Sequence, residues 1–213
     1  MEARDLATEL AHSELPSFAA QLPLTRKAIV FAARLHQGQR RVSDEAPFIL
    51  HPLEVAASLA ATDCPDRVVA AGVLHDVIED TDAVLEEIRG QFDAHIAGLV
   101  SSLTEDERIA DPVERKAALR GQVRAAGRES AVIFAADKLS KVREFRVRLG
   151  NLRRPEAGPP PEMEHQLDHY IASLDMLEDV IPRQAIVRQL RFELEALRIV
   201  HPGEPREAPG PLD

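Results

Sequence analysis

The chain has 213 residues, of which 45% are hydrophobic and none is tryptophan. This length suffices for one well-packed domain, which we favour over two very small ones. The 36 acidic residues outnumber the 26 basic ones and give a formal net charge of -10. This balance argues against a nucleic-acid-coating surface, because phosphate backbones are bound mainly through basic patches. An anionic substrate would need a locally basic, metal-assisted pocket.

Cysteine content and hydropathy narrow the class further. Cys64 is the single cysteine, which excludes an internal disulfide. Neither a signal-peptide pattern nor an apolar run of membrane-spanning length is present. We therefore expect a soluble, cytoplasmic protein that acts on a small molecule and has neither nucleic acid nor a membrane as its partner.

The apolar residues recur mostly at helical spacing. Residues 1–22 are moderately helical without a sharp motif, so we expect them to form an N-terminal helical extension. Gly38 is a plausible stop for the first strong helix, Pro52 suits the first turn of the next, and Asp66 can cap the one after it. The expected helices, in chain order, cover 24–35, 52–61, the stretch from 66 that carries His75, a short segment ending near 90, 94–103, 112–126, 130–150, 162–180 and 183–199.

Two proline-rich segments interrupt this pattern. We expect residues 151–161 to form a rigid, polar connection and residues 201–213 a disordered tail. A period-2 alternation is not sustained anywhere in the chain. The sequence therefore predicts an all-α fold, a single bundle of about eight to ten helices over residues 23–200.

The stretch 68–80 is almost wholly apolar but ends in His75, Asp76, Glu79 and Asp80. Read as one helix, it places His75 over Glu79 and Asp76 over Asp80. Acids at a helix C-terminus oppose the helix dipole, which favours a functional site over a solvated terminus. Because burying such groups without partners is costly, we expect them to meet a cation or each other.

His51 and Asp137 are the best further candidates for a metal site. His51 begins a helix after a loop, and Asp137 interrupts an apolar run. Two imidazoles with two carboxylates suit manganese, iron or zinc in an open site, where metal-bound water is a nucleophile for hydrolysis. Taken singly, His51 also reads as a helix-start residue and Asp137 as an ion-paired acid, so spacing alone leaves both interpretations open.

Four ordered segments of the chain resemble the hydrolase domain of the RelA/SpoT proteins, which belongs to the HD superfamily. They are LHQGQRR at 35–41, PFILHP at 47–52, LHDVIEDT at 74–81 and ADKL at 136–139. The similarity is greatest to the stand-alone small alarmone hydrolases, which include the metazoan SpoT homologue. It runs from about residue 22 to about residue 180 and implies an HD-type hydrolase domain at 23–200.

The resemblance implies a role for each matched position. The positions at which the family binds one manganese ion hold His51, His75, Asp76 and Asp137. Those that position and activate the attacking water hold Glu79 and Asp80. Those that contact the nucleotide hold Arg41, Lys138 and Tyr170. The implied reaction, part of the stringent response, removes pyrophosphate from the ribose 3′ position of the alarmones (p)ppGpp.

Two departures from the family bear on the substrate. Lys141 stands where the family usually has an asparagine that contacts the sugar. It would either bind an additional phosphate or be a solvated helix residue, and both interpretations stay open. Val42 follows Arg41 where the family often has lysine, in a loop longer than usual. The alternatives are therefore hydrolysis of the adenosine alarmones (p)ppApp or of the 2′-phosphate of NADPH.

A non-catalytic module that binds nucleotide is the alternative from another class. The intact set of ligand and acid residues argues against it, because loss of catalysis would remove the need for a costly charge cluster. The chain is too short for a synthetase domain beside this one, so we predict a hydrolase only. A cognate alarmone synthetase in the cell and self-association are left open as partners.

Overall fold

The structure is a computed structural model that describes residues 15–150 and 161–200. Within these ranges the regular elements are helices, and an isolated β-bridge pairs Arg40 with Pro47. The expected all-α fold is confirmed. Most of the expected N-terminal extension (1–14), the polar connection at 151–160 and the tail at 201–213 lie outside the described residues, so the division of the chain at 23 and 200 stays a prediction.

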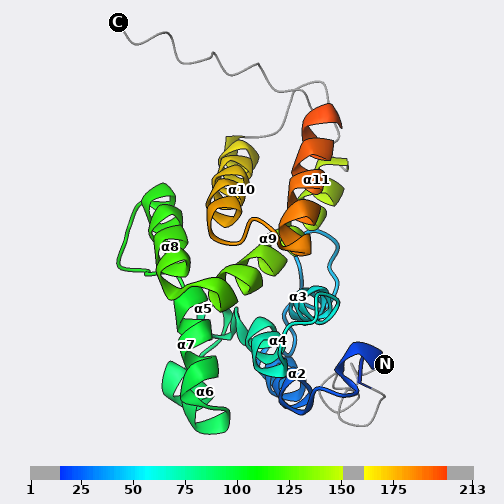
Figure 1. The fold of residues 1–213 in the computed structure, drawn as a ribbon, viewed down its shortest axis with the longest axis vertical. Coiled ribbons are helices and arrows are strands. Elements are labelled where there is room, and N and C mark those ends of the chain that lie inside the picture. Colours follow the sequence, from blue (N-terminus) through cyan, green and yellow to red (C-terminus); the bar gives the residue numbers. More distant parts are fainter. Residues whose placement is uncertain (1–14, 151–160, 201–213) are drawn as a thin grey trace, which may run out of the picture.

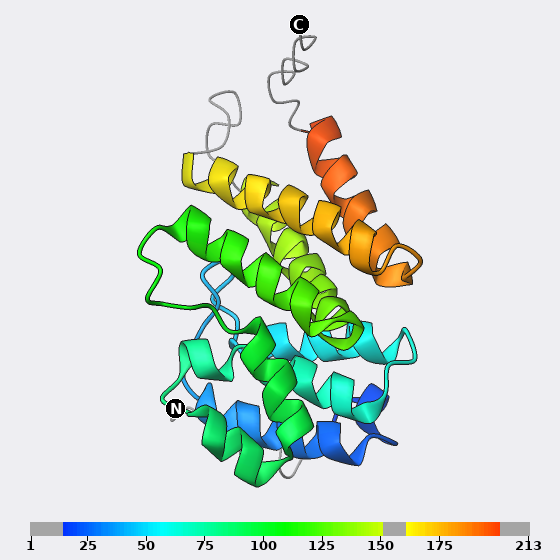
Figure 2. The ribbon, with the colours of Figure 1, turned by 60° about the vertical axis from the view of Figure 1, so that its left-hand side comes forward.

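The helices fall into two groups around one long helix (Figures 1 and 2). Their bounds are η1 (Ser17–Ala19), α2 (Pro23–Leu35), α3 (Leu50–Ala60), α4 (Asp66–Leu74), α5 (Val77–Asp80), α6 (Leu85–Gln91), α7 (Ala94–Leu103), α8 (Pro112–Ala126), α9 (Arg128–Gly150), α10 (Pro161–Val180) and α11 (Ala185–Val200). Helices α2 to α7 form one group, and α8, α10 and α11 form the other. Helix α9 contacts α3, α4 and α7 on one side and α8, α10 and α11 on the other.

Helices α9 and α4 are central because stretches of each have no exposed face. Residues 131–140 of α9 and 68–74 of α4 are all buried, and a helix that is apolar on all sides belongs in the core. Gly72 lets α4 approach α3 closely, because a side chain there would collide with Leu59. Among the described residues, no helix is long and apolar enough to cross a membrane.

Asp66 caps a different helix from the one expected. It is the first residue of α4, which begins after Pro65. Its carboxylate accepts hydrogen bonds from Leu24 N (2.8 Å), Thr25 N (2.9 Å) and Thr25 Oγ1 (2.7 Å). These amides begin α2, where a helix has no acceptors of its own. Asp66 therefore holds the start of α2 against α4, a contact between residues 42 apart in the chain that no local pattern reveals.

The single helix expected through 68–80 is in fact two. Helix α4 ends at Leu74, and α5 begins after Asp76, whose backbone is at φ -96° and ψ -4°. Glu79 and Asp80 thus lie in the first turn of a short helix, where acids are favourable. The dipole argument made for one continuous helix was therefore wrong. Helix α3 also begins two residues earlier than expected, at Leu50, with Pro52 still in its first turn.

Candidate metal centre and active site

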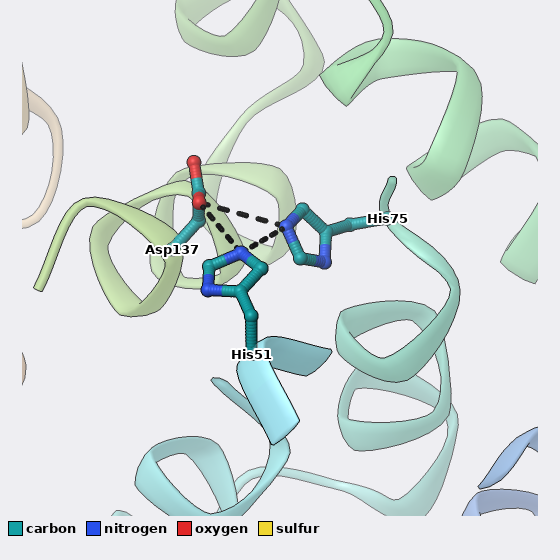
Figure 3. A group of neighbouring side chains, drawn as sticks. All are labelled: His51, His75 and Asp137. Carbon is teal, nitrogen blue, oxygen red and sulfur yellow. Dashed lines mark hydrogen bonds and ion pairs between the residues drawn. The ribbon is translucent and has the colours of Figure 1, made fainter. Parts of the chain in front are cut away.

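Four acid and imidazole side chains meet in the interior between α3, α4 and α9. His51 comes from the first turn of α3, His75 and Asp76 from the turn between α4 and α5, and Asp137 from the middle of α9. Each residue is at most 5% exposed. Figure 3 shows the two imidazole rings pointing toward each other and toward the Asp137 carboxylate.

The imidazole nitrogens and carboxylate oxygens that face one another lie 3.0 to 3.5 Å apart. The Nε2 atoms of His51 and His75 lie 3.3 Å apart. Asp76 Oδ2 lies 3.2 Å from His51 Nε2 and 3.0 Å from His75 Nε2. Asp137 Oδ1 lies 3.4 Å and 3.5 Å from the same two nitrogens. The ligand atoms of His51, His75 and Asp137 all lie within 4.8 Å of one another.

The hydrogen bonds of the outer ring nitrogens indicate which tautomers are present. His75 Nδ1 lies 2.8 Å from Gly72 O, and a carbonyl only accepts, so Nδ1 carries the proton. His51 Nδ1 lies 3.0 Å from Ser140 Oγ, whose own proton goes to Glu54 Oε2 at 2.7 Å. Ser140 therefore accepts from His51 Nδ1. Both Nε2 lone pairs consequently face the carboxylates when the imidazoles are neutral.

These residues fit a divalent metal ion. Asp137 Oδ1 is buried and faces both imidazole nitrogens, and the Lys141 ammonium is the cation beside it, at 3.0 Å. Ring nitrogens and carboxylate oxygens that converge away from water need a cation between them, and a mixed imidazole and carboxylate set suits zinc, iron or manganese. His51, His75, Asp76 and Asp137 would hold the ion.

Two lysines place positive charge against the same carboxylates. Lys138 Nζ lies 2.6 Å from Asp137 Oδ2 and is buried. Lys141 Nζ lies 3.0 Å from Asp137 Oδ1 and 3.7 Å from Asp76 Oδ1, and 35% of its side chain is exposed. Burial alone would raise the pKa of Asp137, but the two lysines hold that pKa well below its usual range.

Glu79 and Asp80 lie beside the cluster. Glu79 Oε1 accepts the backbone N–H of Glu105 at 2.6 Å, and Gln39 Nε2 donates to the Asp80 carbonyl at 2.6 Å. Both acids line a cavity of about 610 Å³ together with Gln39 and Thr81. Burial raises the pKa of both carboxyl groups, which suits them to proton transfer closer to neutral pH.

The remaining expected contacts lie further from the cluster. Arg41 forms ion pairs with Asp44 (2.5 Å) and Glu54 (2.9 Å) in the loop before α3. Tyr170 is only 2% exposed. Its hydroxyl accepts a hydrogen bond from Gln166 at 2.7 Å. The structure thus brings Lys138 and Lys141 to the cluster. Arg41 lies in the loop before α3 and contacts Glu54, and Tyr170 is buried within electrostatic range of Lys141 and Asp137.

Three residues of the site were missed by the sequence interpretation. Glu54 lies three residues after His51, and Ser140 three residues after Asp137, so each shares a helix face with a candidate ligand. That spacing was a usable signal. The backbone N–H of Glu105 contacts Glu79 from a loop 26 residues away. Because any residue type supplies a backbone N–H, the sequence pattern could not predict this contact.

Metal binding should release about one proton per ion at neutral pH. Burial alone would lower the pKa of His75, but Asp76 and Asp137 raise it to about 10, so the ring is protonated at pH ~7. A metal must displace this proton. Apparent Mn²⁺ affinity should therefore rise by about tenfold per pH unit between pH ~7 and ~9. Calorimetry in buffers of different ionisation enthalpy counts the proton, and a pH-independent affinity would contradict the expectation.

The fold and the buried cluster define the class of protein. A model of the HD domain matches residues 28–157, a range that includes the four candidate ligands. The chain belongs to the HD-domain family.

Relatives agree with this assignment and with the resemblance noted from the motifs. The chain is 35% identical over 127 residues to guanosine-3′,5′-bis(diphosphate) 3′-pyrophosphohydrolase MESH1 of Drosophila melanogaster. The aligned part makes up 57% of this chain and 69% of that protein. It is 43% identical over 83 residues to a GTP pyrophosphokinase of Myxococcus xanthus, covering 39% of this chain. It is 32% identical over 167 residues to a guanosine-3′,5′-bis(diphosphate) 3′-pyrophosphohydrolase of Aquifex aeolicus, covering 78% of this chain. The matches span 11% and 23% of those two longer proteins.

Two solved structures share the fold. One, described as a metazoan ortholog of SpoT that hydrolyzes ppGpp, has a TM-score of 0.69 and 25% identity and covers 88% of this chain and 99% of that one. The other, lmo0812 from Listeria monocytogenes EGD-e, has a TM-score of 0.58 and 28% identity and covers 69% of this chain and 92% of that one. The predicted kinship with the metazoan SpoT homologue is confirmed.

Proposed function

We propose that this chain is a metal-dependent hydrolase that removes pyrophosphate from the ribose 3′ position of (p)ppGpp. The observation that carries the proposal is the buried convergence of His51, His75, Asp76 and Asp137. The similarity to MESH1 and to the metazoan SpoT ortholog, which act on this nucleotide by name or title, supports the choice of substrate.

The side chains around the cluster suit this hydrolysis. The reaction consumes water, breaks the phosphorus–oxygen bond to the ribose 3′ oxygen, and yields pyrophosphate and a free 3′-hydroxyl. A bound divalent ion, for which we propose manganese, would supply a Lewis acid and a more acidic water. Glu79 and Asp80 would accept the proton of the attacking water. Lys138 and Lys141 would offset charge on the pyrophosphoryl group that the water attacks, and the departing ribose 3′ oxygen would take up a proton to become the hydroxyl.

A second cavity, which shares no lining residue with the one at Glu79 and Asp80, is a further candidate site for part of the nucleotide. It measures about 720 Å³ between α8 and α10. The Lys138 ammonium lies over Phe134 (4.5 Å to the ring centroid), and the Phe134 ring contacts His169 on the cavity wall, while Lys138 and Phe134 are themselves buried. The wall carries Lys116 and Arg120 together with Asp111, Asp168 and Asp175, and burial lowers the pKa of His169 to about 2, so that its ring is neutral. The charged side chains of this wall are therefore of both signs, and the positive charge nearest the cluster is that of Lys138 and Lys141.

The adenosine alarmones are the second candidate substrates. The resemblance assigns Arg41 to the nucleotide, yet Arg41 is engaged by Asp44 and Glu54. Its neighbour Val42 is 86% exposed and has no polar side-chain atom to distinguish guanine from adenine. We propose that such an enzyme works in the cytoplasm, where it would lower the alarmone level set by a synthetase.

A substrate panel tests the proposal. Wild type and the Asp76→Ala variant are incubated with Mn²⁺ and guanosine alarmones, adenosine alarmones, NADPH or cyclic nucleotides, and the products are identified by mass. We expect GDP and pyrophosphate from ppGpp with wild type only. Asp179→Ala removes a surface ion pair with Arg124 and should leave turnover unchanged. If wild type cleaves no substrate, or only substrates that Asp76→Ala cleaves as well, the proposed hydrolase activity would be refuted.

A further inference from the structure

We propose that Ser140 and Glu54 are positioning residues of the metal centre, which hold His51 in the tautomer and orientation that turn its Nε2 toward the other ligands. Neither residue was assigned a role from the sequence. The inference rests on the metal site proposed above, but it does not depend on which nucleotide is hydrolysed.

The two residues form a continuous chain of hydrogen bonds behind His51. His51 Nδ1 lies 3.0 Å from Ser140 Oγ, and Ser140 Oγ donates to Glu54 Oε2 at 2.7 Å. The other carboxylate oxygen of Glu54 accepts from Arg41 at 2.9 Å. Ser140 is 4% exposed. The chain joins residues 86 and 89 positions apart and so couples α3 to α9 at the metal centre.

The direction of these bonds follows from the donors available. An ionised carboxylate only accepts, so the single hydroxyl proton of Ser140 is committed to Glu54. The serine oxygen is then left as the acceptor for the Nδ1–H of His51. The opposite tautomer of His51 would place a lone pair against that oxygen and a proton among the acidic ligands. The carboxylate also polarises the hydroxyl, which strengthens the bond to Nδ1–H and makes Nε2 a better electron donor.

The two ligand histidines are held in different ways. His75 Nδ1 is held by the backbone carbonyl of Gly72, a contact that side-chain substitution does not remove. His51 depends on side chains alone for the corresponding bond. Its ligand geometry is therefore the part of the centre that a single substitution outside the ligand set can loosen.

The test measures Mn²⁺ affinity of the full chain by chelator competition, without any nucleotide. Ser140→Ala should bind Mn²⁺ about 10- to 100-fold more weakly, as is usual when the partner of a metal-bound histidine is lost. Ser140→Thr, which keeps a hydroxyl, should recover most of the affinity. The matched control is Ser173→Ala, because Ser173 is fully buried and donates to a carbonyl of its own helix.

A double-mutant cycle separates the chain of bonds from general damage. Glu54→Ala should also weaken Mn²⁺ binding, and the double variant should bind no more weakly than Ser140→Ala alone, because both changes interrupt one pathway. Glu54 is half-exposed, so its variant tests the inference even where Ser140→Ala fails to fold. Urea unfolding of the metal-free proteins measures the stability that each variant loses, and Ser140→Ala should lose at least as much as Ser173→Ala because it leaves the buried Nδ1–H of His51 without its acceptor.

The outcomes separate this inference from the proposed function. Mn²⁺ affinity of Ser140→Ala and Glu54→Ala equal to that of Ser173→Ala would overturn the inference, whatever the activity. Strictly additive losses in the cycle would overturn it as well. If both variants bind Mn²⁺ more weakly but the wild-type protein cleaves no alarmone, the inference is supported and the proposed substrate is refuted.

Discussion

Replacing Glu79 with glutamine should lower the turnover of ppGpp by about 10²- to 10⁴-fold while leaving the affinity for Mn²⁺ unchanged. Glu79 lies outside the ligand cluster and accepts the backbone N–H of Glu105 through Oε1. A glutamine oxygen accepts the same hydrogen bond, so the side chain keeps its place and loses only its ability to take a proton. Single-turnover kinetics at saturating Mn²⁺ measure the effect.

The same substitution should stabilise the fold at neutral pH. Burial raises the pKa of Glu79, so the folded state disfavours the ionised form. A carboxyl group shifted in this direction costs stability above its folded pKa, and the cost disappears as the pH falls through that value. Glutamine carries no such cost. The free energy of unfolding should rise by on the order of 1 kcal/mol at pH ~7.5, and the gain should shrink at acidic pH.

A matched control lies on the same cavity wall. Glu87 is an exposed residue of α6 that lines the cavity with Glu79. Glu87→Gln makes the same chemical change at a distance from the cluster and should alter neither turnover nor stability. A Glu79→Gln variant with wild-type turnover would show that Glu79 takes no proton in the reaction and would leave Asp80 as the remaining candidate.

Replacing Lys141 with methionine should tighten Mn²⁺ binding and weaken the metal-free fold. The Lys141 ammonium lies 3.0 Å from Asp137 Oδ1 and 3.7 Å from Asp76 Oδ1. A divalent cation bound by the same carboxylates would be repelled by this positive charge. Removing a like charge at this separation should raise the affinity by about tenfold to a hundredfold. Chelator competition measures this gain.

The metal-free protein should respond in the opposite direction. Without Lys141, the carboxylates of Asp76 and Asp137 lose a counter-cation in a buried site. We expect a loss of stability on the order of 1 kcal/mol, a small value because 35% of the Lys141 side chain is exposed. KM for ppGpp should rise, since the same ammonium is our proposed phosphate contact. Lys27→Met, on α2, is the control for metal affinity and KM and should leave both unchanged, although it removes a contact of Lys27 with the Gln91 carbonyl and the Phe92 ring.

The metal affinity and the stability of the metal-free protein should change in opposite directions, which distinguishes three possible roles of Lys141. A structural role alone would lower stability and leave metal affinity unchanged or weaker. An exposed, solvated lysine would change neither. Only a resident counter-cation gives tighter metal binding together with a weaker metal-free fold, so unchanged or weaker Mn²⁺ binding by Lys141→Met would contradict the role.

Local sequence patterns identified the helices well because helix formation is decided by neighbours in the chain. Apolar spacing placed α7, α8 and α10 within a residue or so of their bounds. Gly38 adopts φ 81° just after α2 ends, as expected for a helix stop. The break at Asp76 was missed, because both sides of it are apolar and the pattern continues across the turn.

The sequence alone therefore determined the all-α class and, with its family-like motifs, the set of side chains to consider for a metal. Tertiary structure decided which of them share a cluster, that Asp66 caps α2, and that Lys141 lies against two ligand carboxylates. It also decided that Ser140 contacts both His51 and Glu54, which lie 89 and 86 residues away from it in the chain. Helical periodicity records interactions over a few residues, whereas these contacts depend on how α3, α4 and α9 pack. That packing places each acceptor beside its donor.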